Sequence, residues 1–249
     1  MKIQYCQVFA FLLFLCGMKL LLCVNRFSDF KALFEAMAPH SVPQHIALPD
    51  PSSANHIISL HYLQHEIDVC ETGFGIFQTT FKVTRAISQK KYHLALKASF
   101  CNAYKHELQI GDIVNVIKDK PGDIGRAGES TFEDLYDQQM LSAESFPHYK
   151  GAFINMNNSY MNVMMPFKKV VAVTVNQYAD MANHEHKKTK YKADIETIDG
   201  LGFVYPCMYE RQPFYQLNVV EGNLASGVFD HEKAKQILND TIFDVIQKL

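Results

Sequence analysis

Two runs of alternating apolar and polar residues lie near the middle of the chain, on either side of a short polar break. The first run extends from Phe77 to Ile87, the second from Tyr92 to Phe100, and Ser88–Lys91 separates them. A period of two residues is typical of a half-buried strand. The pattern therefore predicts an antiparallel hairpin with one face in the core and the other in water.

Other segments space their apolar residues as a helix does, or form strands beside turn residues. Helices are favoured where a polar residue can cap the first turn, and strands where an apolar run is continuous. The predicted helices are Phe27–Met37, Asn55–Val69 (a short strand is the alternative), Ser130–Ala143 and a C-terminal helix capped by Asp230. The predicted strands follow Gly111-Asp112, cover Lys169–Val175 and Phe214–Val220, and form a second hairpin, Thr189–Tyr209, that turns at Asp199-Gly200.

This order of elements predicts an α+β fold, a mostly antiparallel β-barrel or curved sheet with flanking helices, preceded by an N-terminal apolar leader. Prolines are frequent from Pro39 to Ser53, which is typical of an extended linker. We therefore expect residues 1–24 to be a leader, residues 25–53 a helix and linker, and residues 54–249 a single β-rich domain with a C-terminal helix.

The first 24 residues resemble a secretory signal peptide, because a basic start at Lys2 precedes a long apolar run. An uncleaved signal-anchor is the first alternative, although Lys19 inside the apolar run is costly in a membrane. A buried helix of a protein that is not exported is the second. Export predicts a secreted or extracytoplasmic protein, anchored to the membrane if the leader is retained. It would also make the sequons at Asn157 and Asn239 glycosylation sites.

Composition narrows the class of protein only a little. The chain has 249 residues, 48% of them hydrophobic, and a formal net charge of −2. That charge argues against a nucleic-acid partner, because such proteins usually carry a basic excess. Outside the leader the cysteines are Cys70, Cys101 and Cys207, an odd number without a Cys-x-x-Cys pair. Buried free thiols are favoured, and one bridge with a free thiol is the alternative.

Two histidine pairs suggest a divalent metal such as zinc as a cofactor. His61 and His65 are four residues apart and would share one face of a helix. His184 and His186 would share one face of a strand. If the two pairs met, four imidazoles could bind the metal. Solvated polar segments explain the same histidines without a metal.

The chain has no Gly-x-Ser-x-Gly or other nucleophile motif. The leading hypothesis is therefore an exported protein that binds a small apolar ligand or a protein partner in a cavity lined by aromatic and Met side chains. Candidate ligand-binding residues are Phe81, Tyr92, Phe203 and Tyr205, with further methionines in Met156–Met165. One alternative is a metal-dependent hydrolase or lyase that uses the four histidines. Another is a structural or host-interaction protein, and membrane contact is expected only through an uncleaved leader.

Overall fold

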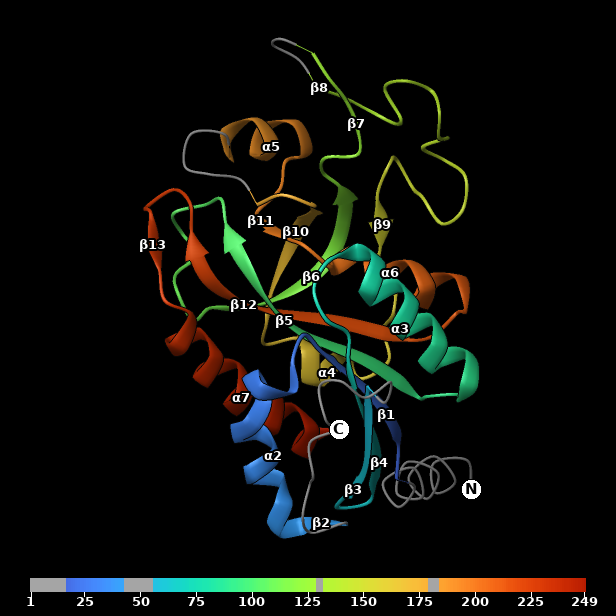
Figure 1. Ribbon diagram of the computed structural model, residues 1–249, viewed down its shortest axis with the longest axis vertical. Helices are drawn as coiled ribbons and strands as arrows, with labels where there is room; N and C mark the ends of the chain where they lie inside the picture. The colour runs from blue at the N-terminus through green and yellow to red at the C-terminus, as the bar shows by residue number, and fades with distance from the viewer. Residues whose placement is uncertain (1–16, 43–55, 129–131, 179–183) are drawn as a thin grey trace, which may run out of the picture.

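The computed structural model describes residues 17–42, 56–128, 132–178 and 184–249. In this part of the chain a mixed sheet runs through the molecule, and five of its strands close into a ring (Figure 1). This confirms the α+β class with a barrel-like sheet and flanking helices. The sheet is not mostly antiparallel, because several neighbouring strands of the ring are parallel. In order around the ring the strands are β5 (Leu94–Ala103), β12 (Phe214–Asn223), β6 (Ile113–Pro121), β10 (Lys168–Thr174) and β11 (Ile195–Thr197).

The sheet extends beyond the ring through the N-terminal part of the chain. Strand β1 (Lys19–Val24) lies parallel to β5 on one side and to β4 (His65–Glu71) on the other. Residues 1–16 of the predicted leader lie outside the described residues, and its last part, Lys19–Val24, is a buried strand of the sheet; the leader stays a prediction. Both strands that pair with β1 come after the predicted boundary at residue 53, and the predicted division of the chain stays a prediction. Among the described residues, no helix has the length and apolar character needed to cross a membrane.

The first half of the predicted central hairpin is wrong. Ile76–Gln89 forms helix α3, and only the second run becomes a strand, β5. The buried side of α3 includes Val83 and Ile87, four residues apart, as expected for a helix. Phe77 and Phe81 are exposed on its outer side. These two exposed aromatic residues produced the apparent alternation.

Three other predicted elements also differ from the structure. The segment predicted as helix 55–69 contains the hairpin of β3 (Ile57–Tyr62) and β4, which is nearer to the strand alternative. The second predicted hairpin is α5 (His184–Tyr191), β11 and α6 (Gly200–Tyr209). Helix α6 is buried on most sides, so its sequence has no polar face to mark the helical period. The predicted helix 130–143 instead contains β8 (Phe132–Asp134), which pairs with β7 (Gly125–Ala127), followed by turns.

The remaining predictions of regular structure are confirmed. They include the helical segment after β1, the strands β6, β10 and β12, and the C-terminal helix α7 (His231–Lys248). Asp230 caps α7, because its Oδ1 accepts a hydrogen bond from the backbone N of Lys233 at 3.0 Å. The other elements are η1 (Phe27–Phe30), α2 (Lys31–Met37), η2 (Ala38–His40), β2 (Ser41–Val42), β9 (Phe153–Ile154), α4 (Met161–Met164) and β13 (Val228–Phe229).

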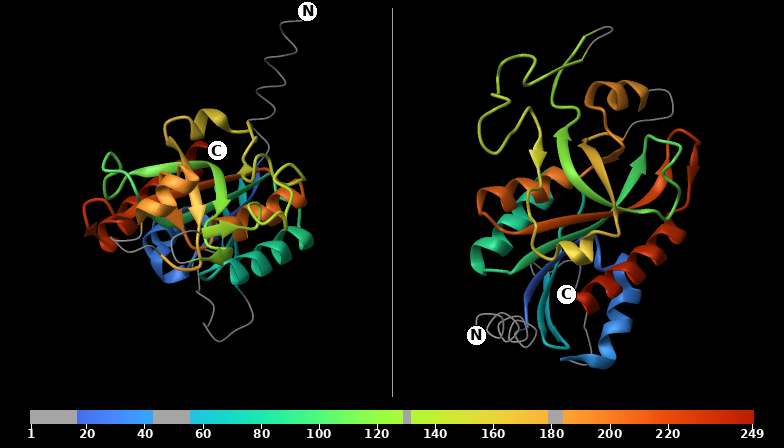
Figure 2. Two further views of the ribbon diagram at one scale, coloured as in Figure 1. Left: turned by 90° about the horizontal axis from the view of Figure 1, so that it is seen from above. Right: turned by 180° about the vertical axis from the view of Figure 1, so that it is seen from behind.

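Helices cover the sheet on two sides (Figures 1 and 2). Each side has its own apolar core. On one side α2 and α7 pack together over β1, β5 and β12, around a core that includes Leu22, Leu96 and Leu238. On the other side α3 packs against α6, around a core that includes Leu21 and Phe203. The interior of the five-strand ring has its own apolar cluster, which includes Cys101.

Candidate functional site

The end of the ring that lies toward α6 holds polar side chains, whereas the rest of its interior is apolar. Lys97, Ser99 and Cys101 are alternate residues of β5, so their side chains point to the same face of the strand. Cys101 belongs to the apolar cluster inside the ring, so Lys97 and Ser99 also point into the ring. Gln216 pairs in register with Lys97, and Asn218 pairs with Ser99, on the parallel strand β12. All four polar residues are buried. The two strands thus bring polar groups together inside the fold.

A buried ion pair forms the centre of this polar cluster. The Nζ of Lys97 lies 2.7 Å from the Oδ2 of Asp199, and the side chains are 0% and 1% exposed. Asn25, directly after β1, donates from Nδ2 to the same carboxylate oxygen at 2.5 Å. Ser99 donates from Oγ to the Oδ1 of Asn25 at 2.7 Å. A buried lysine and aspartate are tolerated in a protein interior when they are paired in this way.

A second buried aspartate, Asp119 on β6, lies next to this pair. Both of its carboxylate oxygens are 2.9 Å from the Oγ1 of Thr174. Burial raises the pKa of Asp119 to about 7, the hydrogen bond from Thr174 opposes that rise, and the charge of Asp199 adds to it. A carboxyl group with this pKa is present in both protonation states near neutral pH, so it can donate or accept a proton.

Gly200, the first residue of α6, allows the polar groups to approach the helix. A Cβ at this position would lie 2.4 Å from the Oδ2 of Asp119 and 2.7 Å from the Oγ1 of Thr197. The first backbone N–H groups of α6 use the two threonines as acceptors, Gly200 to Thr197 at 3.3 Å and Leu201 to Thr174 at 3.0 Å. Glycine is therefore needed here for space.

The location agrees with the general rule for sheets with parallel strands. Asn25 follows the end of β1, and Thr174 and Thr197 are the last residues of β10 and β11. Ligands of such folds bind beyond the carboxyl ends of the parallel strands. Tyr178, which follows β10, is 37% exposed. Burial, followed by the charge of Asp199, raises the pKa of its phenol.

Several buried polar atoms in and near the cluster have no hydrogen-bond partner among the described residues. They are Oδ1 of Asp199, Oε1 and Nε2 of Gln216 and Oδ1 of Asn218. Native interiors leave few such atoms, because each costs about 1–3 kcal/mol of stability. Their concentration at one end of the ring indicates a place built to receive a polar ligand.

The four predicted ligand-binding residues do not meet in one cavity. Tyr92 and Phe203 are buried in the apolar core between the sheet and the α3–α6 pair, and the Tyr92 hydroxyl donates to Asp68 at 2.7 Å. Phe81 and Tyr205 are 64% and 41% exposed. The structure therefore does not bring the four aromatic residues together. The prediction relied on strand parity in two segments that are in fact helices α3 and α6.

The structure does not bring the two predicted histidine pairs together either. His61 and His65 lie on the two strands of the β3–β4 hairpin, where the backbone N of Met18 donates to the Nδ1 of His65 at 3.4 Å. His184 and His186 are in α5, at the other end of the molecule (Figure 1). The side chain of His184 lies outside the described residues. Within the described ranges, no group of three or more His, Cys, Asp or Glu residues is arranged to hold a metal ion.

The prediction of buried free thiols is confirmed, and one of the two sequons is buried. Cys70, Cys101 and Cys207 are buried free thiols. Asn239 is 3% exposed and joins α7 to η1 and α2 in the core, accepting from the N of Leu33 and donating to the O of Asp29, each at 2.9 Å. A glycan has no room there. At the other sequon, the Oδ1 of Asn157 accepts a hydrogen bond from the N of Ser159, two residues on.

The residues of the polar cluster were missed by the sequence analysis. Lys97 interrupts the apolar residues of a strand that is buried on both faces, and this was the available signal. Asp199 was interpreted as part of a hairpin turn. Asn25 and Asp119 carry no local signal at all, because their role depends on which strands lie side by side.

Neither a known protein-family model nor a curated protein sequence matches the chain. Solved structures do match it along nearly its whole length. The 5'-methylthioadenosine/S-adenosyl homocysteine nucleosidase of Campylobacter jejuni is 16% identical with a TM-score of 0.75, over 94% of this chain and 100% of that chain. Native futalosine hydrolase of Helicobacter pylori is 15% identical with a TM-score of 0.73, over 93% and 98%. The chain has the fold of these nucleosidases.

A third match agrees with this fold. The Streptococcus pneumoniae MTA/SAH nucleosidase in complex with 8-aminoadenine is 12% identical with a TM-score of 0.71, over 93% of this chain and 100% of that chain. These matches overturn the predicted exported protein with an aromatic and Met-lined binding cavity, together with its metal-enzyme and host-interaction alternatives. The description as a secreted, histidine-rich glycoprotein loses its support as well. The cellular location, and any membrane contact through a leader, stay predictions.

Proposed function

We propose that the protein is a nucleosidase, which hydrolyses the N-glycosidic bond of a nucleoside at the polar cluster inside the ring. The observation that carries this proposal is the pair of buried aspartates at the carboxyl ends of the strands. One of them, Asp199, is paired with Lys97, and the other, Asp119, has a pKa of about 7. The full-length likeness to nucleosidase structures supports the same reaction.

The reaction requires two groups with different protonation states. The bond from the sugar carbon C1' to the base nitrogen breaks, the oxygen of a water molecule bonds to C1', and a proton moves from the water, directly or through the enzyme, to the base. Protonated Asp119 donates a proton to the departing base. The carboxylate of Asp199 orients the water and stabilises the positive charge that develops on the sugar. Glycoside hydrolysis divides the work between two carboxyl groups in a comparable way.

A purine nucleoside is the proposed substrate class. Tyr178 is partly exposed and its phenol is affected by the charge of Asp199, and we propose that its ring packs against a planar base. The nucleosidases of like fold act on 5'-methylthioadenosine and S-adenosyl homocysteine, and on futalosine, by their names. The side chains of Lys97 and Asp199 are at most 1% exposed, so the residues that cover them must move before a substrate can reach them.

The test is release of a free base from candidate nucleosides. The purified protein is incubated with 5'-methylthioadenosine, S-adenosylhomocysteine and futalosine, and the base and the free sugar are separated by chromatography. We expect base and sugar in equal amounts from at least one substrate. Asp199→Asn should lower the rate about 100-fold or more, as expected for a group that acts at the reacting atoms. Asp240→Asn, which changes an exposed aspartate of α7, is the matched control and should leave the rate unchanged.

Two results would contradict the proposal. One is a folded protein that releases no base from any of the three nucleosides. The other is equal activity of the wild-type protein and Asp199→Asn, which would place the reaction elsewhere in the molecule.

A further inference from the structure

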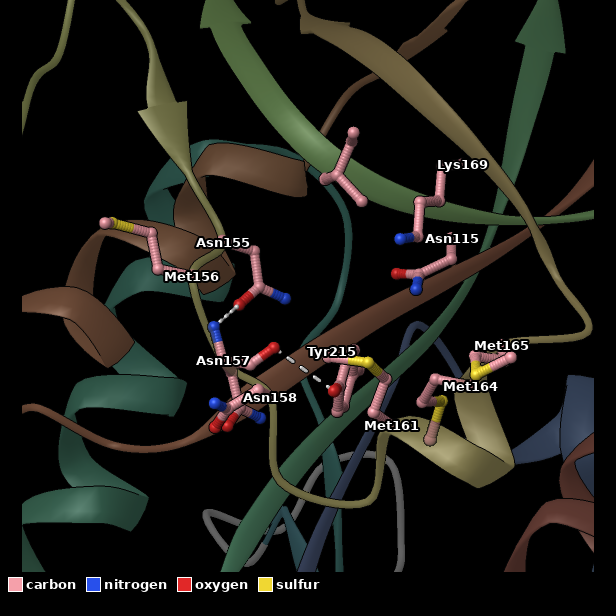
Figure 3. Close-up of a pocket in the computed structure, with 11 residues that line it drawn as sticks. Asn115, Asn155, Met156, Asn157, Asn158, Met161, Met164, Met165, Lys169 and Tyr215 are labelled. Carbon is pink, nitrogen blue, oxygen red and sulfur yellow. Dashed lines mark hydrogen bonds between the residues drawn. The ribbon is translucent and has the colours of Figure 1, made fainter.

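A second pocket lies outside the ring, between β6, β10, β12 and the loop around α4 (Figure 3). Its volume is about 240 Å³. Asn115 in its wall alternates along β6 with Val114 and Val116, which lie in the apolar cluster inside the ring. The pocket is therefore separated by the strand β6 from the interior of the ring, which contains the proposed catalytic cluster.

Asn115 is the polar residue of this pocket that has an unpaired side-chain oxygen and could bind a ligand. Asn115 is 3% exposed, and its Oδ1 has no hydrogen-bond partner among the described residues. Figure 3 shows the amide turned into the space between the strands and the loop. An unpaired amide that is this deeply buried destabilises the protein unless a ligand or water pairs with it.

Three other polar residues of the wall already hold the loop. Asn155 donates from Nδ2 to the backbone O of Phe214 at 3.0 Å. The hydroxyl of Tyr215 donates to the backbone O of Ser159 at 2.8 Å, and the Oδ1 of Asn157 accepts from the N of the same serine at 3.1 Å. The loop is thus fixed by its own hydrogen bonds, and the pocket is formed before any ligand binds.

The charge and the apolar part of the wall restrict the ligand further. Lys169 is the one charged residue among those that line the pocket, and no carboxylate lines it. A cation is therefore disfavoured, and an acceptor group beside Lys169 is favoured. Met161 and Met165 contribute thioether side chains, which pack well against the faces or edges of planar rings.

We propose that this pocket binds a planar cyclic amide, a ring in which an N–H group stands next to a carbonyl, as in uracil or hypoxanthine. The ring N–H donates to the Oδ1 of Asn115, and its carbonyl accepts from the Nδ2 of Asn115 or from the ammonium of Lys169. An asparagine amide recognises the edges of bases by the same pairing of one donor with one acceptor. The ligand would be recognised by hydrogen bonds rather than by apolar surface. This proposal does not depend on the proposed nucleosidase reaction.

The test is a calorimetric titration of the full chain with uracil, with hypoxanthine, and with 1,3-dimethyluracil as the chemical control. Dimethyluracil has the same ring but no N–H to donate. We expect uracil and hypoxanthine to bind, and dimethyluracil to bind at least about tenfold more weakly, as expected for the loss of a buried hydrogen bond. Equal binding of uracil and dimethyluracil, or no binding of uracil at millimolar concentration, would overturn the proposal.

Variants assign the binding to this pocket. Asn115→Leu should abolish uracil binding while keeping or raising the melting temperature, because it removes a buried unpaired amide. Lys169→Met should weaken binding severalfold, whereas Lys168→Met, which changes the neighbouring residue that does not line the pocket, should not. Unchanged uracil binding by a folded Asn115→Leu variant would refute the site. Base release from nucleosides should be the same in all these variants, which separates this test from that of the proposed function.

Discussion

The face of strand β5 that points into the ring changes from polar to apolar within four residues. At one end Cys101 and Ala103 lie in an apolar cluster, as an interior position normally requires. At the other end Lys97 and Ser99 form a polar network with Asn25 and Asp199. The first region contributes stability through packing. The second contains an ion pair and unpaired polar atoms that cost stability, which is the pattern expected where a fold has kept groups for function.

The largest difference between the two ends should follow from breaking the ion pair. Lys97→Met leaves the carboxylate of Asp199 buried without its cation, so we expect the free energy of unfolding to fall by about 3–5 kcal/mol. Cys101→Ala, at the apolar end of the same strand face, should cost about 1 kcal/mol, because it removes one sulfur atom from the core. Urea denaturation of both variants measures the difference.

A double variant keeps this prediction testable if Lys97→Met does not fold. Lys97→Met combined with Asp199→Leu removes both charges, and should recover most of the lost stability because no charge remains buried alone. If Lys97→Met costs no more than Cys101→Ala, the pair is not buried as the structure has it.

Asp119 should make the contribution of the polar end to stability depend on pH, unlike the contribution of the apolar end. Its pKa in the folded protein, about 7, lies above its ordinary value of 3.8. Protonation therefore favours the folded state: the contribution of this group is complete below about pH 4 and is lost as the pH rises to about 7. Over that range the free energy of unfolding therefore falls by roughly 1.4 kcal/mol for each unit by which the pH rises. Asp119→Asn lacks this contribution.

The measurement is denaturation of the wild-type protein and Asp119→Asn at several values between pH 5 and pH 8. The variant should gain stability relative to the wild type as the pH rises. A difference between the two proteins that stays constant across this range would show that Asp119 does not titrate there.

The smallest effect on stability is expected at Gln216. Neither its Oε1 nor its Nε2 has a partner among the described residues, so Gln216→Leu should change the free energy of unfolding by less than about 1 kcal/mol, or raise it. Base release should fall nonetheless, by about tenfold, if the amide contacts the substrate. A loss of 2 kcal/mol or more would indicate that the amide supports the fold.

Local pattern was sufficient for elements that have one wet and one buried side. The C-terminal helix was predicted for this reason, and the cap at Asp230 was visible in the sequence. Helix α6 is buried on most sides, and α3 exposes Phe77 and Phe81, so neither displays the polar and apolar faces on which prediction depends.

The site was beyond the reach of the sequence for a different reason. Asn25 and Asp199 are 174 positions apart, and Lys97 and Asp199 are 102 apart. They meet because β1 lies beside β5 and because α6 begins over the end of the ring. Strand order of this kind depends on the whole chain, and a single sequence does not display it. Only the lysine in the buried strand marked the place.

The most direct measurement is a crystal structure of Asp199→Asn with 5'-methylthioadenosine bound. The variant should bind the nucleoside without turning it over, so the intact substrate can be located. Our account predicts the sugar next to residues 119 and 199 and the base toward Tyr178, with the amide of Gln216 or Asn218 now paired. A nucleoside bound anywhere else, with the polar cluster still closed around Lys97, would contradict the claim that this end of the ring is the catalytic site.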